Sequence, residues 1–321
     1  MKRDELHRNL LEALEKKIPD KSELIAMLTE ILFMEKGAIY RRLRGEVPFS
    51  FYEAVNMVEK LDIPMNSLIQ PNSVPTNRFE LHLIDYANMR EREYKQWEKY
   101  IDLIRLAKTD PYSKIAESSN VLPLSIYAGF DSLSRYFLFK DQYLFSGTES
   151  RTSFSNVDFS ERLHSIYQSY FNESKHFAKT LYIWDYLIFE YMATDIRFFS
   201  GINLISDKDV RQIKADLFAL LDYIEQIALT GCFEETGNPV SFYISDITLD
   251  ADYSYVKFND VCISLVRTFI LNSVVSTDKS SYEKIKNWIQ SLKKSSTLIT
   301  QSGAVFRADF FERQRRVVSE L

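Results

Sequence analysis

Basic side chains gather in one short segment near the amino end of the chain, between positions 36 and 44. Lysine and arginine neutralise phosphate groups, and the planar guanidinium of arginine also pairs with the edge of guanine through two hydrogen bonds. A tyrosine among them adds a hydroxyl that donates or accepts a hydrogen bond. Such residue types in this spacing indicate contact with a nucleic-acid backbone and with base edges. The residues concerned are Lys36, Tyr40, Arg41, Arg42 and Arg44.

These side chains share a surface only if the segment is helical, and its apolar positions predict that it is. Ala38, Ile39 and Leu43 fall on one side of a helix, whereas most of the basic residues fall on the other. The preceding segment, 23–32, carries its own apolar stripe at helical spacing. Two short helices separated by a brief break at 33–34 match a helix-turn-helix pattern.

Start and stop signals fall where this pattern needs them. Asp20 and Glu23 have the spacing of a capping box at the start of the first helix. Gly45 predicts the end of the second helix, and Ser50 with Glu53 predicts the start of a further helix through another capping box.

With these features, the run from Leu24 to Ile69 resembles the DNA-binding domains of the Cro and λ-repressor type, also called the xenobiotic-response-element type. The likeness lies in the basic helix, its glycine stop, the loop with proline, and the helix and tail over 51–69. The family often has an apolar and then an acidic residue before the glycine, where this chain has Arg42 and Leu43. The glutamine common at the start of the first helix is also absent, and Ser22 stands in that region.

The resemblance implies a helical domain over residues 1–69 whose basic helix enters the major groove of double-stranded DNA. One such domain reads only a short half-site. The resemblance therefore also implies a homodimer that places two recognition helices about 34 Å apart, one turn of DNA.

The contacts implied by the resemblance are of two kinds. Lys36, Tyr40 and Arg41 are expected at bases or the nearby backbone. The phosphate contacts are expected from Arg42, Arg44 and Ser22, the last at the start of the supporting helix. The alternative is that the basic cluster is only a solvated helix face.

Composition bounds the remaining possibilities. The chain has 321 residues, 45% of them hydrophobic, and a formal net charge of −5, so DNA contact has to come from a local basic patch. Cys232 and Cys262 lack the spacing of a metal site or a disulfide framework, which favours a reducing, cytoplasmic location. Residues 1–14 are too charged for a secretory signal. Charges within 177–199 argue against a membrane span and favour a buried helix.

The pattern along the chain predicts a mainly α fold with two domains. Residues 1–69 are expected to form the DNA-binding domain, 70–77 a linker with two prolines, and 78–321 a larger helical domain for dimerisation or sensing. The segment 78–108 is expected to be one long helix, either a connector or a solvated outer helix. Further helices are expected over 4–16, 121–145, 158–199 (with Asp158 and Glu161 as a capping box), 207–229, 279–292 and 308–321.

One region predicts strands instead. Partial alternation over 241–249, 253–258 and 261–271, with Asn259-Asp260 as a two-residue turn, indicates a short antiparallel β meander. The last of these runs could equally be a buried helix.

Little in the sequence indicates catalysis. The four histidines are scattered, and there is no Walker loop or dinucleotide fingerprint, so neither an enzyme nor a cofactor or metal site is expected. The aromatic residues between Tyr182 and Phe199 form either ordinary core or the lining of a ligand pocket, and core is the favoured interpretation.

The sequence therefore predicts a sequence-specific, DNA-binding transcriptional regulator. It is expected to act as a homodimer, with an unknown small molecule or protein as a further partner and no membrane association. One alternative is a protein-interaction module that uses the same helical fold, and another is an enzyme tethered to DNA. Strongly salt-dependent binding to DNA separates the first reading from the second.

Overall fold

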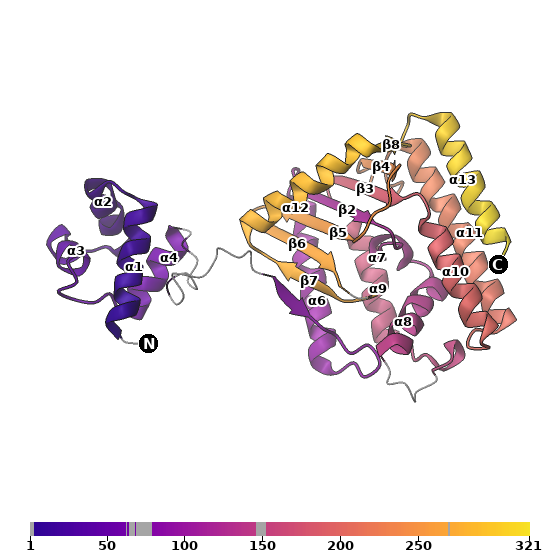
Figure 1. Ribbon diagram of the computed structural model, residues 1–321, viewed down its shortest axis with the longest axis horizontal. Coiled ribbons are helices and arrows are strands. Elements are labelled where there is room, and N and C mark those ends of the chain that lie inside the picture. Colours follow the sequence, from indigo (N-terminus) through magenta and orange to yellow (C-terminus); the bar gives the residue numbers. More distant parts are fainter. Residues whose placement is uncertain (1–2, 62, 64–67, 69–78, 146–151, 269) are drawn as a thin grey trace. The chain divides into compact units, whose positions relative to one another are not determined.

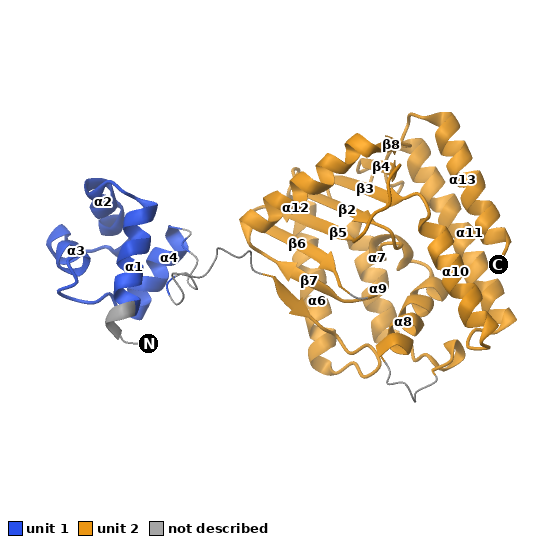
Figure 2. Ribbon diagram, viewed as in Figure 1, with its two compact units in different colours: residues 1–76 blue, residues 77–321 orange. Residues whose placement is uncertain are grey.

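The computed structural model describes the chain except for residues 1–2, 62, 64–67, 69–78, 146–151 and 269 (Figure 1). Two compact units divide the chain, residues 1–76 and 77–321 (Figure 2). Helix predominates over strand, so the expected mainly α character is confirmed at that level. The linker expected over 70–77 lies outside the described residues.

The first unit is a small helical bundle around a single apolar core. Leu14, Leu28 and Ile39 contribute fully buried side chains from three different helices, and Met57 adds a fourth. Burial of a few such side chains gives a unit of this size most of its stability. Its helices are α1 (Arg3–Lys17), α2 (Lys21–Leu32), α3 (Lys36–Leu43) and α4 (Phe51–Lys60).

The boundaries of these helices follow local signals in the sequence. The Asp20 carboxylate accepts the backbone N–H of Glu23 at 2.8 Å and so caps α2. Gly45 has a φ of 77°, which a glycine adopts without strain, in the turn after α3. Ser50 and Glu53 exchange the two hydrogen bonds of a complete capping box at the start of α4.

In the described part of the second unit, eight strands form one mixed sheet. The centre is parallel, with β2, β3 and β4 side by side, and antiparallel strands flank it on both sides. The strands in sheet order are β1 (Glu80–His82), β7 (Ser273–Ser276), β6 (Val261–Arg267), β5 (Tyr253–Phe258), β2 (Lys114–Ser119), β3 (Lys179–Asp185), β4 (Val240–Ser245) and β8 (Ser296–Leu298).

Helices cover both faces of this sheet (Figure 1). Because side chains alternate along a strand, Tyr182 and Trp184 face one helical layer, whereas Leu181 and Ile183 face α12 (Lys279–Leu292). The larger core lies on the first of these faces. The helices that contribute to it are α6 (Glu91–Arg105), α7 (Leu124–Tyr127), α8 (Asp131–Phe145), α9 (Glu161–Ser174), α10 (Ile188–Gly201), α11 (Asp207–Thr230) and α13 (Ala304–Ser319).

The prediction of one long helix over 78–108 is wrong. Its first part is the edge strand β1, which pairs with β7, and only α6 is helical for any length. The side chain of Asn272 accepts the N–H of Ile84 at 2.8 Å and donates to its carbonyl oxygen at 3.2 Å. Partners nearly two hundred residues away therefore decide the local structure here.

The continuous helical interpretation of 158–199 is also wrong, because β3 lies between α9 and α10. A parallel central strand is buried on both faces, and its apolar run is indistinguishable by periodicity from a buried helix. Ser160, and not Asp158, caps α9 by accepting the N–H of Leu163. By contrast, the helices expected over 207–229, 279–292 and 308–321 are confirmed.

The meander is confirmed only in part. β5 and β6 pair as an antiparallel hairpin around Asn259-Asp260, and the run from Val261 is a strand and not a helix. β7 extends this meander, whereas β4 lies elsewhere in the sheet, parallel to β3. Hydrogen bonding to β3 takes precedence over sequence proximity.

The helix expected over 121–145 is interrupted between α7 and α8. Gly129 lies in that interruption, and a Cβ added there would be 2.6 Å from Cε1 of Phe171 in α9. Phe171 is itself packed against Phe130 and Tyr223. A glycine is therefore required for the close approach of these elements.

We predict that Gly129→Ala lowers the free energy of unfolding of the second unit by about 1–3 kcal/mol, the usual cost of overpacking. The three tryptophans all lie beyond residue 77, so urea unfolding followed by tryptophan fluorescence reports on that unit. Gly201→Ala is the matched control, since its Cβ meets nothing within 4 Å. Equal midpoints for the two variants would contradict the packing described here.

Candidate nucleic-acid interface

The outer face of α3 carries most of the basic residues expected to contact DNA. Lys36, Tyr40 and Arg44 are spaced four residues apart, at every helical turn, and all three are exposed. Arg41 lies beside this row, with 63% of its side chain exposed. These four residues form a continuous polar surface, which we call the α3 surface.

The inner face of α3 holds the helix in place. Ile39 is fully buried and packs in the same core as Leu28 of α2 and Met57 of α4. Leu43 is partly buried against that core. The apolar side of α3 therefore fixes which residues face solvent.

Arg42 lies differently from the other basic residues. Its Nη2 donates to Oε1 of Glu53 at 3.0 Å, and the two side chains are only 19% and 11% exposed. Glu53 also accepts the backbone N–H of Ser50 at 2.7 Å. Burial raises the pKa of Glu53, but the Ser50 N–H and the Arg42 guanidinium outweigh it and hold that pKa below its usual value. Arg42 therefore joins α3 to α4, and this geometry does not support its expected phosphate contact.

Arg41 and Arg44 have weaker ties within the unit. Both guanidinium groups approach Glu46, with Nε–O distances of 3.6 Å and 3.2 Å. All three side chains are largely exposed, and ion pairs of this kind contribute little because water and salt screen them. Both arginines can therefore turn to another anion at small cost.

Ser22 is exposed in the first turn of α2. Unpaired N–H groups at a helix N-terminus favour an anion such as phosphate. Here the N–H of Glu23 is already taken by the Asp20 carboxylate, so an anion at this end meets Ser22 through its hydroxyl or its own N–H.

Exposed aromatic residues accompany this surface in the same unit, and the sequence analysis did not single them out. Phe33, in the left-handed turn after α2, is 93% exposed. Phe51 and Tyr52, at the start of α4, are 79% and 74% exposed. Position at a helix terminus, outside the apolar stripe, was the available signal.

The other expected features of the chain are distributed over the second unit. Of the aromatic residues between 182 and 199, Tyr182, Trp184, Phe189 and Phe199 are buried in the core, whereas Phe198 is half exposed. Both cysteines are free. The described residues contain no group of three or more His, Cys, Asp or Glu side chains that is arranged to hold a metal ion. Among the described helices, none has the length and apolar character needed to cross a membrane.

Comparison of the chain with protein-family models, with curated proteins and with solved structures found no match.

We predict that Arg42→Ala loosens α3 and α4. Loss of a charged hydrogen bond costs about 1–3 kcal/mol, which corresponds to amide hydrogen exchange about 5- to 150-fold faster in these helices. Because the pKa of Glu53 is lowered, the stabilisation is present above the ordinary value of 4.5 and is lost as the pH falls through the lowered pKa. Mass spectrometry of exchange in the full chain measures this. Arg41→Ala is the control, and protection equal to that of the control would rule out the joining role of Arg42.

Proposed function

We propose that this protein is a sequence-specific, DNA-binding transcriptional regulator in which α2 and α3 act as a helix-turn-helix and α3 is the recognition helix. The observation that carries the proposal is the α3 surface, where basic and hydrogen-bonding side chains face solvent at every turn of a helix anchored by Ile39. The major groove admits one helix, and its base edges offer acceptors to such side chains.

The contacts divide by position along the helix. We assign Lys36, Tyr40 and Arg41 to base edges or the nearby backbone, because the first turns of a recognition helix lie deepest in the groove. We assign Arg44 and Ser22 to phosphate. Arg42 is left out of the contact set, since Glu53 holds it inside the unit.

Charge supports a local interface in place of a general attraction to DNA. The chain as a whole carries a net charge of −5, whereas the stretch from Glu35 to Glu46 contains four basic and two acidic residues. We propose a homodimer, with the second unit serving assembly or the binding of an effector, because one recognition helix reads too few base pairs for specificity. We also propose a cytoplasmic location, in keeping with two free cysteines.

A protein-interaction role for the first unit is the second candidate, and one observation favours it. Phe33, Phe51 and Tyr52 expose large aromatic rings, which are enriched at protein–protein interfaces. Such binding would depend on apolar contact and would change little with salt.

Selection of fragmented genomic DNA by the purified full chain separates the two candidates. Regulation predicts enrichment of a small set of sites, and affinity that falls steeply between 50 mM and 200 mM salt. No enrichment, together with salt-insensitive capture of one protein, would overturn the proposal.

We predict that Arg41→Ala weakens binding to a selected site by about 5- to 150-fold, the range given by one guanine contact of about 1–3 kcal/mol. The loss is smaller on random DNA, because a base contact is sequence-specific. Gel-shift titration gives both affinities, and Arg8→Ala provides an exposed arginine of α1 as the control. Identical affinities for Arg41→Ala and Arg8→Ala would refute the assignment of Arg41.

We predict a different effect for Arg44→Ala. Loss of a phosphate contact lowers affinity for selected and random DNA by the same factor, and it reduces the slope of log affinity against log salt by about 1. A specific loss with an unchanged slope would show that Arg44 reads bases.

A further inference from the structure

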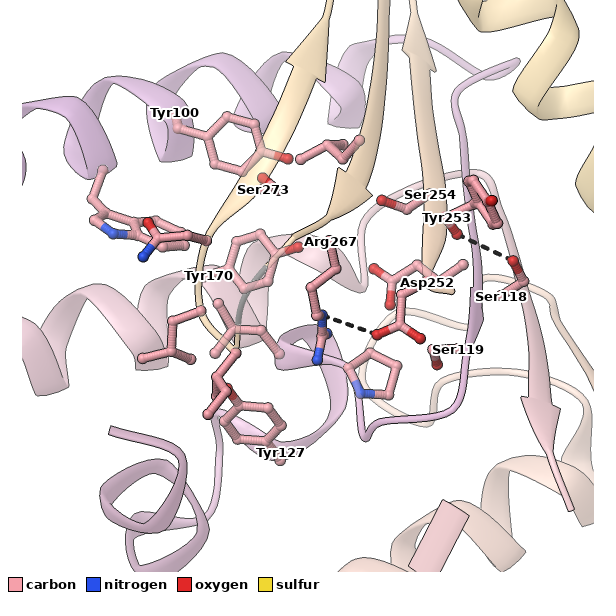
Figure 3. Close-up of a pocket in the computed structure, with 18 of the residues that line it drawn as sticks. Tyr100, Ser118, Ser119, Tyr127, Tyr170, Asp252, Tyr253, Ser254, Arg267 and Ser273 are labelled. Atoms are coloured by element: carbon pink, nitrogen blue, oxygen red, sulfur yellow. Dashed lines mark hydrogen bonds and ion pairs between the residues drawn. The ribbon is translucent and has the colours of Figure 1, made fainter. Parts of the chain in front are cut away.

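A cavity of about 140 Å³ lies in the second unit, beside the end of β2 (Figure 3). At this point the direction of the sheet reverses, because β5 runs antiparallel to β2. The wall opposite the strands comes from the helices α6, α7 and α9. An engineered cavity of about 150 Å³ binds benzene, so this one accommodates about six non-hydrogen atoms.

Tyrosine rings form the helical wall of the cavity. Tyr100, Tyr127 and Tyr170 lie along one side of the pocket in Figure 3, one from each of the three helices. Trp97 packs against Tyr170 with a ring-centre distance of 6.0 Å, and Tyr100 stacks on Tyr170 at 6.1 Å. These contacts fix the rings, whose negative faces attract a cation.

Glu117 of β2 contributes a buried carboxyl group to the same cavity. Its side chain belongs to a residue only 9% exposed, and it accepts a hydrogen bond from Ser125 at 3.0 Å. No ion pair to Glu117 is found among the described residues. An anion buried without a cation is costly, and such a group is expected to acquire a partner.

The other charged groups of the cavity neutralise each other. Arg267 and Asp252 point toward one another, with Nε and Oδ2 3.0 Å apart, and the N–H of Asn120 donates to the second oxygen of Asp252 at 2.8 Å (Figure 3). Glu117 is therefore the one lining carboxylate whose charge has no matching cation among the described residues. With Asp252 occupied in this way, the cavity has no second free carboxylate for acid–base catalysis with Glu117, which favours binding over turnover.

A second polar group of the cavity lacks a partner. Ser119 is 2% exposed, and its Oγ has no hydrogen-bond partner among the described residues. It lies two residues after Glu117 on the same strand, so both side chains face the same side of the sheet. A hydroxyl and a carboxylate side by side match the several N–H donors of one ammonium group.

We propose that this cavity binds a primary alkylammonium ion, with its ammonium group on the carboxylate of Glu117 and the hydroxyl of Ser119 and its carbons against the tyrosine rings. The charge-assisted hydrogen bonds hold the ammonium group, and the ring faces add cation–π attraction. The volume limits the enclosed part of the ligand to a short alkyl chain. This inference concerns the second unit alone and does not depend on DNA binding by the first.

The affinity is expected to depend on pH. Burial raises the pKa of Glu117 to about 7, against opposing effects of Ser125 and Arg267, while Asp252 raises it further. Tyr100, Tyr170 and Tyr182 also face this carboxyl, and burial raises their own pKa values, so they remain neutral. Because an ammonium ion pairs only with the ionised carboxylate, binding strengthens as the pH rises through 7 and releases a proton.

Calorimetric titration of the full chain with n-butylammonium chloride tests the proposal. We expect saturable binding at one site, stronger at pH 8 than at pH 6, and no binding of n-butanol or sodium butyrate, which have the same chain with neutral and negative head groups. Equal binding of butanol would show an apolar cavity without charge selection and would overturn the proposal. Binding of butyrate alone would overturn it by assigning the site to Arg267. Absence of heat with all three probes would also overturn it.

Variants connect the binding to the two polar groups. Glu117→Gln keeps the shape and removes the charge, so affinity for n-butylammonium falls by about 30-fold or more and its pH dependence disappears. Ser119→Ala breaks no internal contact and lowers affinity by about 2- to 10-fold, which keeps the test open if the glutamine variant does not fold. Glu312→Gln on α13, an exposed carboxylate, is the control. Affinity unchanged in both cavity variants would refute the assignment.

Discussion

The position of α3 depends on a small number of contacts on its inner side. A helix of eight residues is too short to persist by itself in water. Burial of Ile39 among residues of α2 and α4 supplies the packing, and the Arg42–Glu53 pair ties the last turn of α3 to the capping box of α4. These two contacts determine the rotation of α3, and hence which four side chains make up the α3 surface. The proposed reading of DNA follows from that rotation, because a shift of one residue would bury the side chains that are meant to reach the groove.

The second unit obeys a different constraint, which is the change of strand direction between β2 and β5. Parallel strands joined by crossing helices need cover on both faces, and that cover comes from the large core on one side and α12 on the other. At the end of β2, three helices and the antiparallel strands approach without filling the space. The cavity with Glu117 lies there. A buried carboxyl group at this place reduces stability unless it is protonated or paired, so its retention in the core is best explained by a ligand that pairs with it.

Sequence reasoning succeeded where structure is decided by neighbours along the chain. The Asp20 cap, the Ser50–Glu53 box and the Gly45 turn are local, and each predicted a helix boundary that the structure contains. It failed at β1 and β3, whose partners are distant strands. Arg42 shows the same limit in the site: Glu53 lies eleven residues away and was already explained by its capping role, so nothing in the sequence separated Arg42 from the exposed arginines. Glu117 carried no signal at all, because the strand that places it was not recognised.

The proposal for the whole protein rests on one claim, that α3 enters the major groove. Methylation interference on a selected DNA site tests it directly, because dimethyl sulfate modifies guanine N7 in the major groove and adenine N3 in the minor groove. Entry of α3 predicts that methylated guanines block binding in two clusters about 10 base pairs apart, while methylated adenines do not. Interference confined to adenine N3, or none on either base, would contradict the account.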